Sequence, residues 1–104
     1  MARTYVVTGS ASGIGAATAS LLRSRGEKVI GIDLANADVE ADLSSAAGRL
    51  AAAAKASELA GGKIDAVIAC AGISAPISKT MAINYFGVTE LLTALLPALR
   101  ESAT

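Results

Sequence analysis

The chain has 104 residues, and its nine basic side chains balance nine acidic ones. Because no run of like charge stands out, nucleic acid and anionic membrane surfaces are not expected as partners. The sequence contains no His, which excludes Ser-His-Asp and Cys-His catalysis within this chain, and we predict no metal site.

Length and composition predict one domain over residues 1–104. Hydrophobic residues make up 53% of the chain but aromatic residues only 3%, so the core must be built from aliphatic side chains. Cys70 is the single cysteine, and no segment has the pattern of an export signal. No apolar stretch approaches the roughly 20 residues of a membrane span. We therefore expect a cytoplasmic protein without a membrane partner.

The first third of the chain predicts two strands around one helix. A β-branched run at Thr4–Thr8 predicts a buried strand, and Lys28–Asp33 predicts a second strand that is apolar up to its acidic end. Between them, Ile14–Arg25 predicts a helix that ends at Gly26. The apolar residues expected on the buried face of this helix are Ala17, Leu21 and Leu22.

The rest of the chain continues the alternation. Val39–Asp42 predicts a very short strand, Ala46–Leu59 a helix capped near Ser44 or Ser45, and Ile64–Cys70 a fourth, nearly continuous apolar strand. After a loop at 74–78, a long helix is expected from about Lys79 to Arg100, with a kink or a frayed last turn at Pro97. Its apolar stripe comprises Val88, Leu91, Leu92, Leu95, Leu96 and Leu99.

Alternating strands and helices predict an α/β fold with a parallel sheet and right-handed crossovers. The expected strand order is 3-2-1-4, which is the first half of a doubly wound sheet. Ligands of such sheets bind outside the carboxyl ends of the strands. Residues that follow those ends are therefore the candidate site residues.

A glycine-rich turn follows the first strand. Its sequence is Thr-Gly-Ser-Ala-Ser-Gly-Ile-Gly, from Thr8 to Gly15. Gly9 permits a sharp turn, Gly13 leaves room for a pyrophosphate, and Gly15 lets the helix pack closely on the strand. The start of the following helix then offers unpaired N–H groups to the phosphates. For a glycine pattern alone, a turn without a ligand is the alternative.

The spacing of this turn resembles the T-G-x-x-x-G-x-G fingerprint of the short-chain dehydrogenase/reductase family, and the resemblance extends over essentially the whole chain. It implies a Rossmann-type fold, of which this chain forms the N-terminal half, and a nicotinamide dinucleotide as cofactor. The turn residues expected at the cofactor are Gly9, Ser12, Gly13, Ile14 and Gly15.

Asp33 ends the second strand 20 positions after Gly13. This is about the separation at which an acidic residue accepts hydrogen bonds from the adenosine ribose, and a carboxylate there repels a 2′-phosphate. Ser12 and Leu34 stand where relatives that bind NADP often carry basic residues. We therefore predict NAD as the cofactor. The alternative is an Asp that only solvates the end of a strand.

Two further segments match the family. Asp42 resembles its aspartate beside the adenine ring, with Leu43 next to it, although an Asp before a helix can also be only an N-cap. Cys70, Ala71 and Gly72 match the family's Asn-Ala-Gly, where small residues let the backbone approach the cofactor ribose. The Cys in place of Asn puts the Asn hydrogen bonds in doubt, and Cys70 is also readable as a small core residue.

Asn84 corresponds by resemblance to the Asn of the family's catalytic tetrad, the alternative being an Asn that only kinks the helix. The Tyr-x-x-x-Lys that would supply the proton is missing, because Tyr5 and Tyr85 have no Lys four positions later. No segment resembles the strand that bears the family's catalytic Ser. We therefore expect a chain that stops before the catalytic segment.

The resemblance implies an oxidoreductase that transfers hydride between NAD(H) and a small-molecule carbonyl or secondary alcohol. The patterns Gly-Ile-Asp-Leu, Ala-Asp-Leu-Ser and Asn-Tyr-Phe-Gly-Val-Thr-Glu-Leu-Leu are similar to the bacterial 3α-hydroxysteroid dehydrogenase/carbonyl reductase branch of the family. The alternatives are a nucleotide-binding module without turnover and an inactive truncated chain. An open fourth strand and an uncovered leucine stripe also predict a homo-oligomer.

Overall fold

The computed structural model describes residues 2–72 and 82–103. Four parallel strands form one sheet: β1 (Thr4–Thr8), β2 (Lys28–Asp33), β3 (Val39–Glu40) and β4 (Ala66–Ala69). Their order is β3-β2-β1-β4, which confirms the predicted order and fold class. The loop at 74–78 and the start of the long helix at 79–81 fall outside the described residues.

The register of the sheet centres on β1. Val6 is opposite Ile30 of β2 on one side and Val67 of β4 on the other. All four strands point the same way, so their carboxyl ends meet at one edge of the sheet. That edge carries the turns that were singled out in the sequence.

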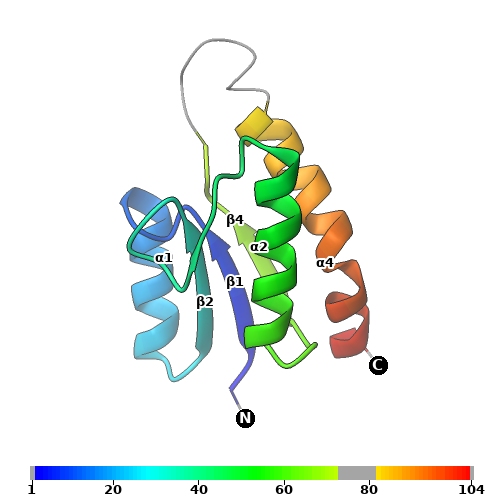
Figure 1. Cartoon of the computed structure of the whole chain (residues 1–104). Coiled ribbons are helices and arrows are strands. Elements are labelled where there is room, and N and C mark those ends of the chain that lie inside the picture. Colours follow the sequence, from blue (N-terminus) through cyan, green and yellow to red (C-terminus); the bar gives the residue numbers. More distant parts are fainter. Residues whose placement is uncertain (1, 73–81, 104) are drawn as a thin grey trace.

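The helices lie on both faces of the sheet (Figure 1). Helix α1 (Gly13–Ser24) packs on one face, while α2 (Ala46–Leu59) and α4 (Gly87–Ala103) lie side by side on the other. A Ser45 side chain accepts the Gly48 N–H and caps α2, as the sequence predicted for this position. Among the residues that the structure describes, no helix is long and apolar enough to cross a membrane.

The hydrophobic core fills the space between the sheet and the α2–α4 pair. Strand residues alternate between the two faces, so Val6, Ile30 and Ile32 point into this core. From the helices come Ala52, Ala53, Ala56, Leu91, Leu95 and Ala98. Small Ala side chains on α2 let this helix lie close to its neighbours, which explains how a core nearly free of aromatic residues closes.

The predicted apolar face of α1 is wrong at two of its three positions. Ala17 and Leu21 are exposed, and only Leu22 is half-buried. The buried positions are Gly15 and Ala19, four residues apart on one side of the helix. Small residues allow the helix to approach the sheet, and this close approach decides which side faces inward. The helix itself runs from Gly13 to Ser24, one residue earlier at each end than predicted.

The long C-terminal helix differs from the prediction over residues 82–86. Residues Ala82–Phe86 form a π-helix, η1, before α4 begins. Helix α4 then runs through Pro97 to Ala103, so the last turn is not frayed. Leu91 and Leu95 of the predicted stripe are buried, whereas Leu96 is exposed.

Strands β3 and β4 are shorter than predicted. β3 stops at Glu40, where the Ala41 N–H donates to the Asp33 carbonyl and the chain then leaves the sheet. β4 begins two residues after Ile64, whose N–H donates to the Ala98 carbonyl of α4 instead of joining the sheet.

Candidate functional site

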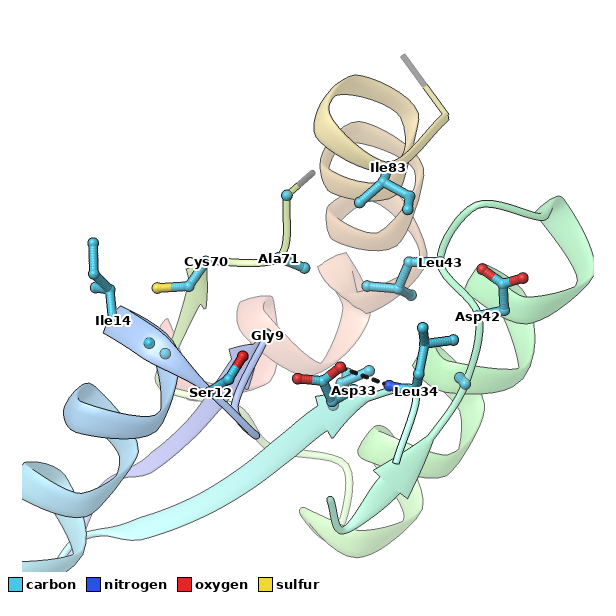
Figure 2. A pocket seen from close by; sticks show the side chains of 15 residues that line it. Gly9, Ser12, Ile14, Asp33, Leu34, Asp42, Leu43, Cys70, Ala71 and Ile83 are labelled. Carbon is cyan, nitrogen blue, oxygen red and sulfur yellow. Dashed lines mark hydrogen bonds between the residues drawn. The ribbon is translucent and has the colours of Figure 1, made fainter. Parts of the chain in front are cut away.

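The carboxyl ends of the strands open into a cavity of about 400 Å³ (Figure 2). Its walls come from the turn after β1, the end of β2, the segment after β3, the segment after β4 and one residue of η1. The lining residues are Gly9, Ser12, Gly13, Ile14, Gly15, Ile32, Asp33, Leu34, Ala41, Asp42, Leu43, Cys70, Ala71, Gly72 and Ile83.

Every residue predicted at the cofactor lines this one cavity, although four separate segments supply them. Contact with a cofactor stays a prediction for each of them. Sequence reasoning missed Ile32, Ala41 and Ile83. Ile32 directly precedes Asp33, and Ala41 directly precedes Asp42. Both could have been predicted from the sequence as neighbours of residues already assigned to the cavity. Ile83 has no such signal, because only the fold brings η1 to the cavity.

Close contacts require two of the three glycines in the turn after β1, Gly9 and Gly15. A Cβ on Gly9 would lie 2.8 Å from the Ala71 nitrogen, and its φ of 68° is in the left-handed region. A Cβ on Gly15 would overlap the Gly9 carbonyl. Gly13 is different, because its φ is 57° and nothing lies within 4 Å of a Cβ built there. The empty space at Gly13 lies inside the cavity wall, where a phosphate could approach the backbone.

Thr8 anchors this turn to the neighbouring strand. It is buried, and its Oγ1 accepts the Ala71 N–H at 3.1 Å. On the other side, the Gly9 N–H donates to the Ile32 carbonyl at 2.8 Å. The turn is thereby fixed to β2 and to the segment after β4. The sequence places Thr8 at the end of a strand and at the start of the fingerprint but indicates no role for its side chain, and the structure adds this anchoring contact.

The carboxylate of Asp33 is held by two backbone N–H groups. Its Oδ2 accepts from Ala11 at 2.9 Å, and its Oδ1 accepts from Leu34 at 2.7 Å. Each carboxylate oxygen can accept more than one hydrogen bond. The side chain therefore arrives at the cavity oriented, with lone pairs left for hydroxyl donors, and Leu34 lies beside it at the exposed rim (Figure 2).

Asp42 does not cap α2, since Ser45 holds that position. Its Oδ1 accepts from the Ser44 backbone at 2.9 Å and from the Ser44 hydroxyl at 2.6 Å. These bonds fix the loop just before α2. Asp42 and Leu43 form the wall of the cavity opposite the glycine-rich turn (Figure 2).

Cys70 and Asn84 lie on the side of β4 and η1. Cys70 lines the cavity, and its N–H donates to the Thr8 carbonyl at 3.3 Å. Asn84 is exposed and lies outside the cavity lining, but a Cβ on Gly72 would be 3.1 Å from its Oδ1. Gly72 thus lets Asn84 pack against the segment that ends β4. Asn84 occupies the middle of the π-helical turn, where the helix is locally widened.

A parallel sheet in this order, with a glycine-rich turn leading into a helix at the cavity, defines a Rossmann-type α/β domain. A family model described as short chain dehydrogenase matches residues 3–104. The chain therefore belongs to the short-chain dehydrogenase family.

Three relatives illustrate the similarity. The chain is 41% identical over 99 residues to a 3-alpha-hydroxysteroid dehydrogenase/carbonyl reductase of Comamonas testosteroni, covering 92% of this chain and 38% of that protein. It is 38% identical over 107 residues to a coniferyl-alcohol dehydrogenase of a Pseudomonas species, covering 95% of this chain and 40% of that protein. A crystal structure of the 3-alpha-hydroxysteroid dehydrogenase from Pseudomonas sp. B-0831, complexed with NADH, matches with a TM-score of 0.89 and 48% identity over 92% of this chain and 42% of that one.

These comparisons confirm the predicted family and the predicted similarity to its 3α-hydroxysteroid dehydrogenase branch. The chain spans about two fifths of the length of these relatives.

Proposed function

We propose that the cavity binds NAD(H) in preference to NADP(H). The observation that carries this proposal is the oriented carboxylate of Asp33, which leaves acceptors for ribose hydroxyls and would repel a 2′-phosphate. Ser12 and Leu34 add no positive charge to the same part of the cavity. A relative in this branch was crystallised with NADH, which supports the same class of cofactor.

The residues present fit such a cofactor. The open space at Gly13 and the start of α1 suit the pyrophosphate, because the first N–H groups of a helix favour anions. Asp33 and Leu34 would hold the adenosine ribose, Asp42 and Leu43 the adenine. The segment from Cys70 to Gly72 would lie along the remainder of the dinucleotide. When bound, the cofactor supplies hydride transfer, while the protein binds and orients it.

The proposed reaction is hydride transfer between NAD(H) and a carbonyl or secondary alcohol, with hydroxysteroids among the substrates. The names of the relatives, a hydroxysteroid dehydrogenase/carbonyl reductase and an alcohol dehydrogenase, support this class. Asn84 is proposed as the tetrad-type Asn of that chemistry. The 104 residues contain no Tyr-x-x-x-Lys, so this stretch by itself lacks the positioned acid that carbonyl reduction needs.

Titration of the 104-residue chain with NADH and with NADPH tests the cofactor. NADH should bind at least about tenfold more tightly than NADPH, because the Asp33 carboxylate would repel the 2′-phosphate of NADPH. A tenfold difference corresponds to about 1.4 kcal/mol of binding free energy. Replacing Asp33 with Ala and Leu34 with Arg should reverse the preference. Asp33→Asn keeps the shape of the side chain without its charge and should reduce the discrimination while keeping NADH binding. Tighter binding of NADPH by the unmodified chain would contradict the proposal.

The same chain should show no turnover with secondary alcohols, ketones or hydroxysteroids when NADH absorbance is followed. General acid–base catalysis of the missing kind contributes about 10²–10⁴-fold. Turnover that survives Tyr85→Phe would mean that another group supplies the proton. Turnover that disappears with this change would instead assign the proton to Tyr85.

We also propose that the 104-residue chain self-associates. In the described part of the chain, β4 is an outer strand, and an unpaired strand edge favours pairing with another chain. Sedimentation at micromolar concentration should show dimers or larger species, and a monomer across that range would contradict the expectation.

A further inference from the structure

The cavity wall formed by Asp42 and Leu43 is held from behind by the first turn of α2. A Cβ on Gly48 would overlap the Asp42 carbonyl, so this turn packs directly against the backbone of the wall. Ser45 adds a second contact, because its backbone N–H donates to the same carbonyl, with the nitrogen 3.4 Å from the oxygen. The position of the wall therefore depends on contacts made by α2.

Arg49, in this same turn, makes the most buried polar contact of the wall. Its side chain is only 8% exposed, and its Nη1 donates to the Leu43 carbonyl at 3.0 Å. Its Nε donates to the Glu90 carboxylate of α4 at 3.2 Å. The guanidinium thus joins the cavity wall to a helix that lies on the core side of the sheet.

The ion pair alone does not explain this arrangement. The Glu90 side chain is about half exposed, and ion pairs with exposed partners contribute little to stability, so stability is weak grounds for placing a guanidinium here. Arginine does offer several donors in a fixed plane, which lets one group hold a carbonyl and a carboxylate at the same time. Glu90 balances the charge, whereas the bond to Leu43 fixes a residue of the cavity.

We propose that Arg49 is a positioning residue for the adenine end of the cavity, acting through the Leu43 carbonyl. This inference rests on the proposed NAD(H) function, because it assigns the Leu43 wall to the adenine. Loss of the Arg49 bond leaves a buried carbonyl without that donor and releases the wall. Arg49 itself does not touch the cofactor, since it is not among the residues that line the cavity.

Two matched variants separate positioning from stability. Arg49→Met and Glu90→Gln both remove the ion pair, but only the first removes the donor to Leu43. Both should lower the melting temperature. At a temperature well below unfolding, Arg49→Met should weaken AMP and NADH binding by the same factor, about tenfold, because the ligand must then fix the loosened wall when it binds. Glu90→Gln should bind both within about twofold of wild type, the small effect expected of a partly exposed charge.

Equal affinities for wild type and Arg49→Met would overturn the inference, as would equal losses in both variants. If Arg49→Met does not fold, the wild-type chain still decides. The Nη–H signals of Arg49, which include the donor to the Leu43 carbonyl, should shift in ¹⁵N spectra as AMP is added, and no shift at saturating AMP would overturn the inference. If the wild-type chain binds neither AMP nor NADH, the proposed function itself fails.

Discussion

On the α2–α4 face of the sheet, side chains from three strands and two helices form a continuous buried cluster, whereas on the α1 face the packing is sparse. Among the described residues, α1 buries only Gly15 and Ala19, and it leaves Ile14 and Leu21 exposed. Helices cover both faces of the sheet in Figure 1, but the two faces have different roles. The α2–α4 face supplies most of the buried side chains, and α1 brings its first turn to the cavity.

The difference shows how a small domain separates folding from binding. Leu91 and Leu95 of α4 are fully buried in the core, and neither of them lines the cavity. Gly13 and Gly15, at the start of α1, line the cavity and contribute no side-chain area to a core. Changes on the two faces should therefore produce different losses.

Leu95→Ala should have the largest effect on stability. This side chain is fully buried in the core cluster, so its truncation leaves a cavity and should lower the free energy of unfolding by about 2–5 kcal/mol. Leu21→Ala makes the same chemical change on α1, where half the residue is exposed, and should cost under about 0.5 kcal/mol. Urea denaturation measures both, and similar losses would contradict the contrast between the faces.

Gly15→Ala should act mainly on binding. The new Cβ would overlap the Gly9 carbonyl, so the glycine-rich turn must move away from its position at the cavity. We expect a stability loss of about 1–3 kcal/mol, typical of overpacking, and NADH binding weakened by more than Leu95→Ala weakens it. Calorimetric titration at a temperature where both variants are folded makes the comparison. NADH affinity retained in Gly15→Ala would show that the turn tolerates displacement.

Asp65 fastens α4 to the amino end of the sheet. Hydrogen bonds from the Ser102 hydroxyl and then from the Thr4 N–H lower the pKa of Asp65 below its ordinary value. A carboxyl whose pKa is lower in the folded state stabilises the fold above its ordinary pKa, about 3.9, and loses that contribution as the pH falls through the lowered value. Ser102→Ala should therefore destabilise at pH 7 and converge with wild type in strong acid.

Thr93→Ala is the control for Ser102→Ala. Its hydroxyl donates to the Thr89 carbonyl of the same helix, so no titrating group is involved. The stability difference between this variant and wild type should not depend on pH. If Ser102→Ala behaves in the same way in denaturation curves from pH 7 to pH 2, its hydroxyl does not set the pKa of Asp65.

Arg23→Met should have the smallest effect. Arg23 joins α1 to Asp38 at 3.2 Å, but both side chains are about half exposed, and exposed ion pairs contribute about 0.2–1 kcal/mol. Asp38 keeps its bond from the Gly31 N–H at 2.8 Å, so the connection after β2 stays in place. The loss should shrink further in 1 M NaCl, and a loss above about 2 kcal/mol would show that α1 is held by charge.

The sequence predicted most of the fold because its signals are local. β1, β2 and α2 have the predicted bounds, since β-branched runs, an Ala-rich segment and flanking glycines are read within a few residues. Asp33 and Gly13 could be assigned to one cavity because parallel strands bring their carboxyl ends together. These predictions needed no knowledge of which helix covers which face.

The failures arise where that knowledge is needed. Periodicity placed Leu21 inside, but Gly15 and Ala19 set the side of α1 that meets the sheet. Ile83 reaches the cavity only through the fold, and the buried role of Arg49 depends on a partner 41 positions away. Contacts between elements distant in the sequence leave no local pattern, so the structure was required to find them.

The central claim is that the cavity at the carboxyl ends of the strands is the cofactor site. The most direct test of this claim is to map NADH binding residue by residue. Amide signals of the ¹⁵N-labelled chain should shift for residues 9–15, for Asp33 and Leu34, for Asp42 and Leu43, and for Cys70 to Gly72. Signals from Ala52 and Leu95, in the core on the other side of the wall, should move little. Saturable binding of NADH without shifts at the cavity residues, or with the main shifts along α2 and α4, would contradict the claim.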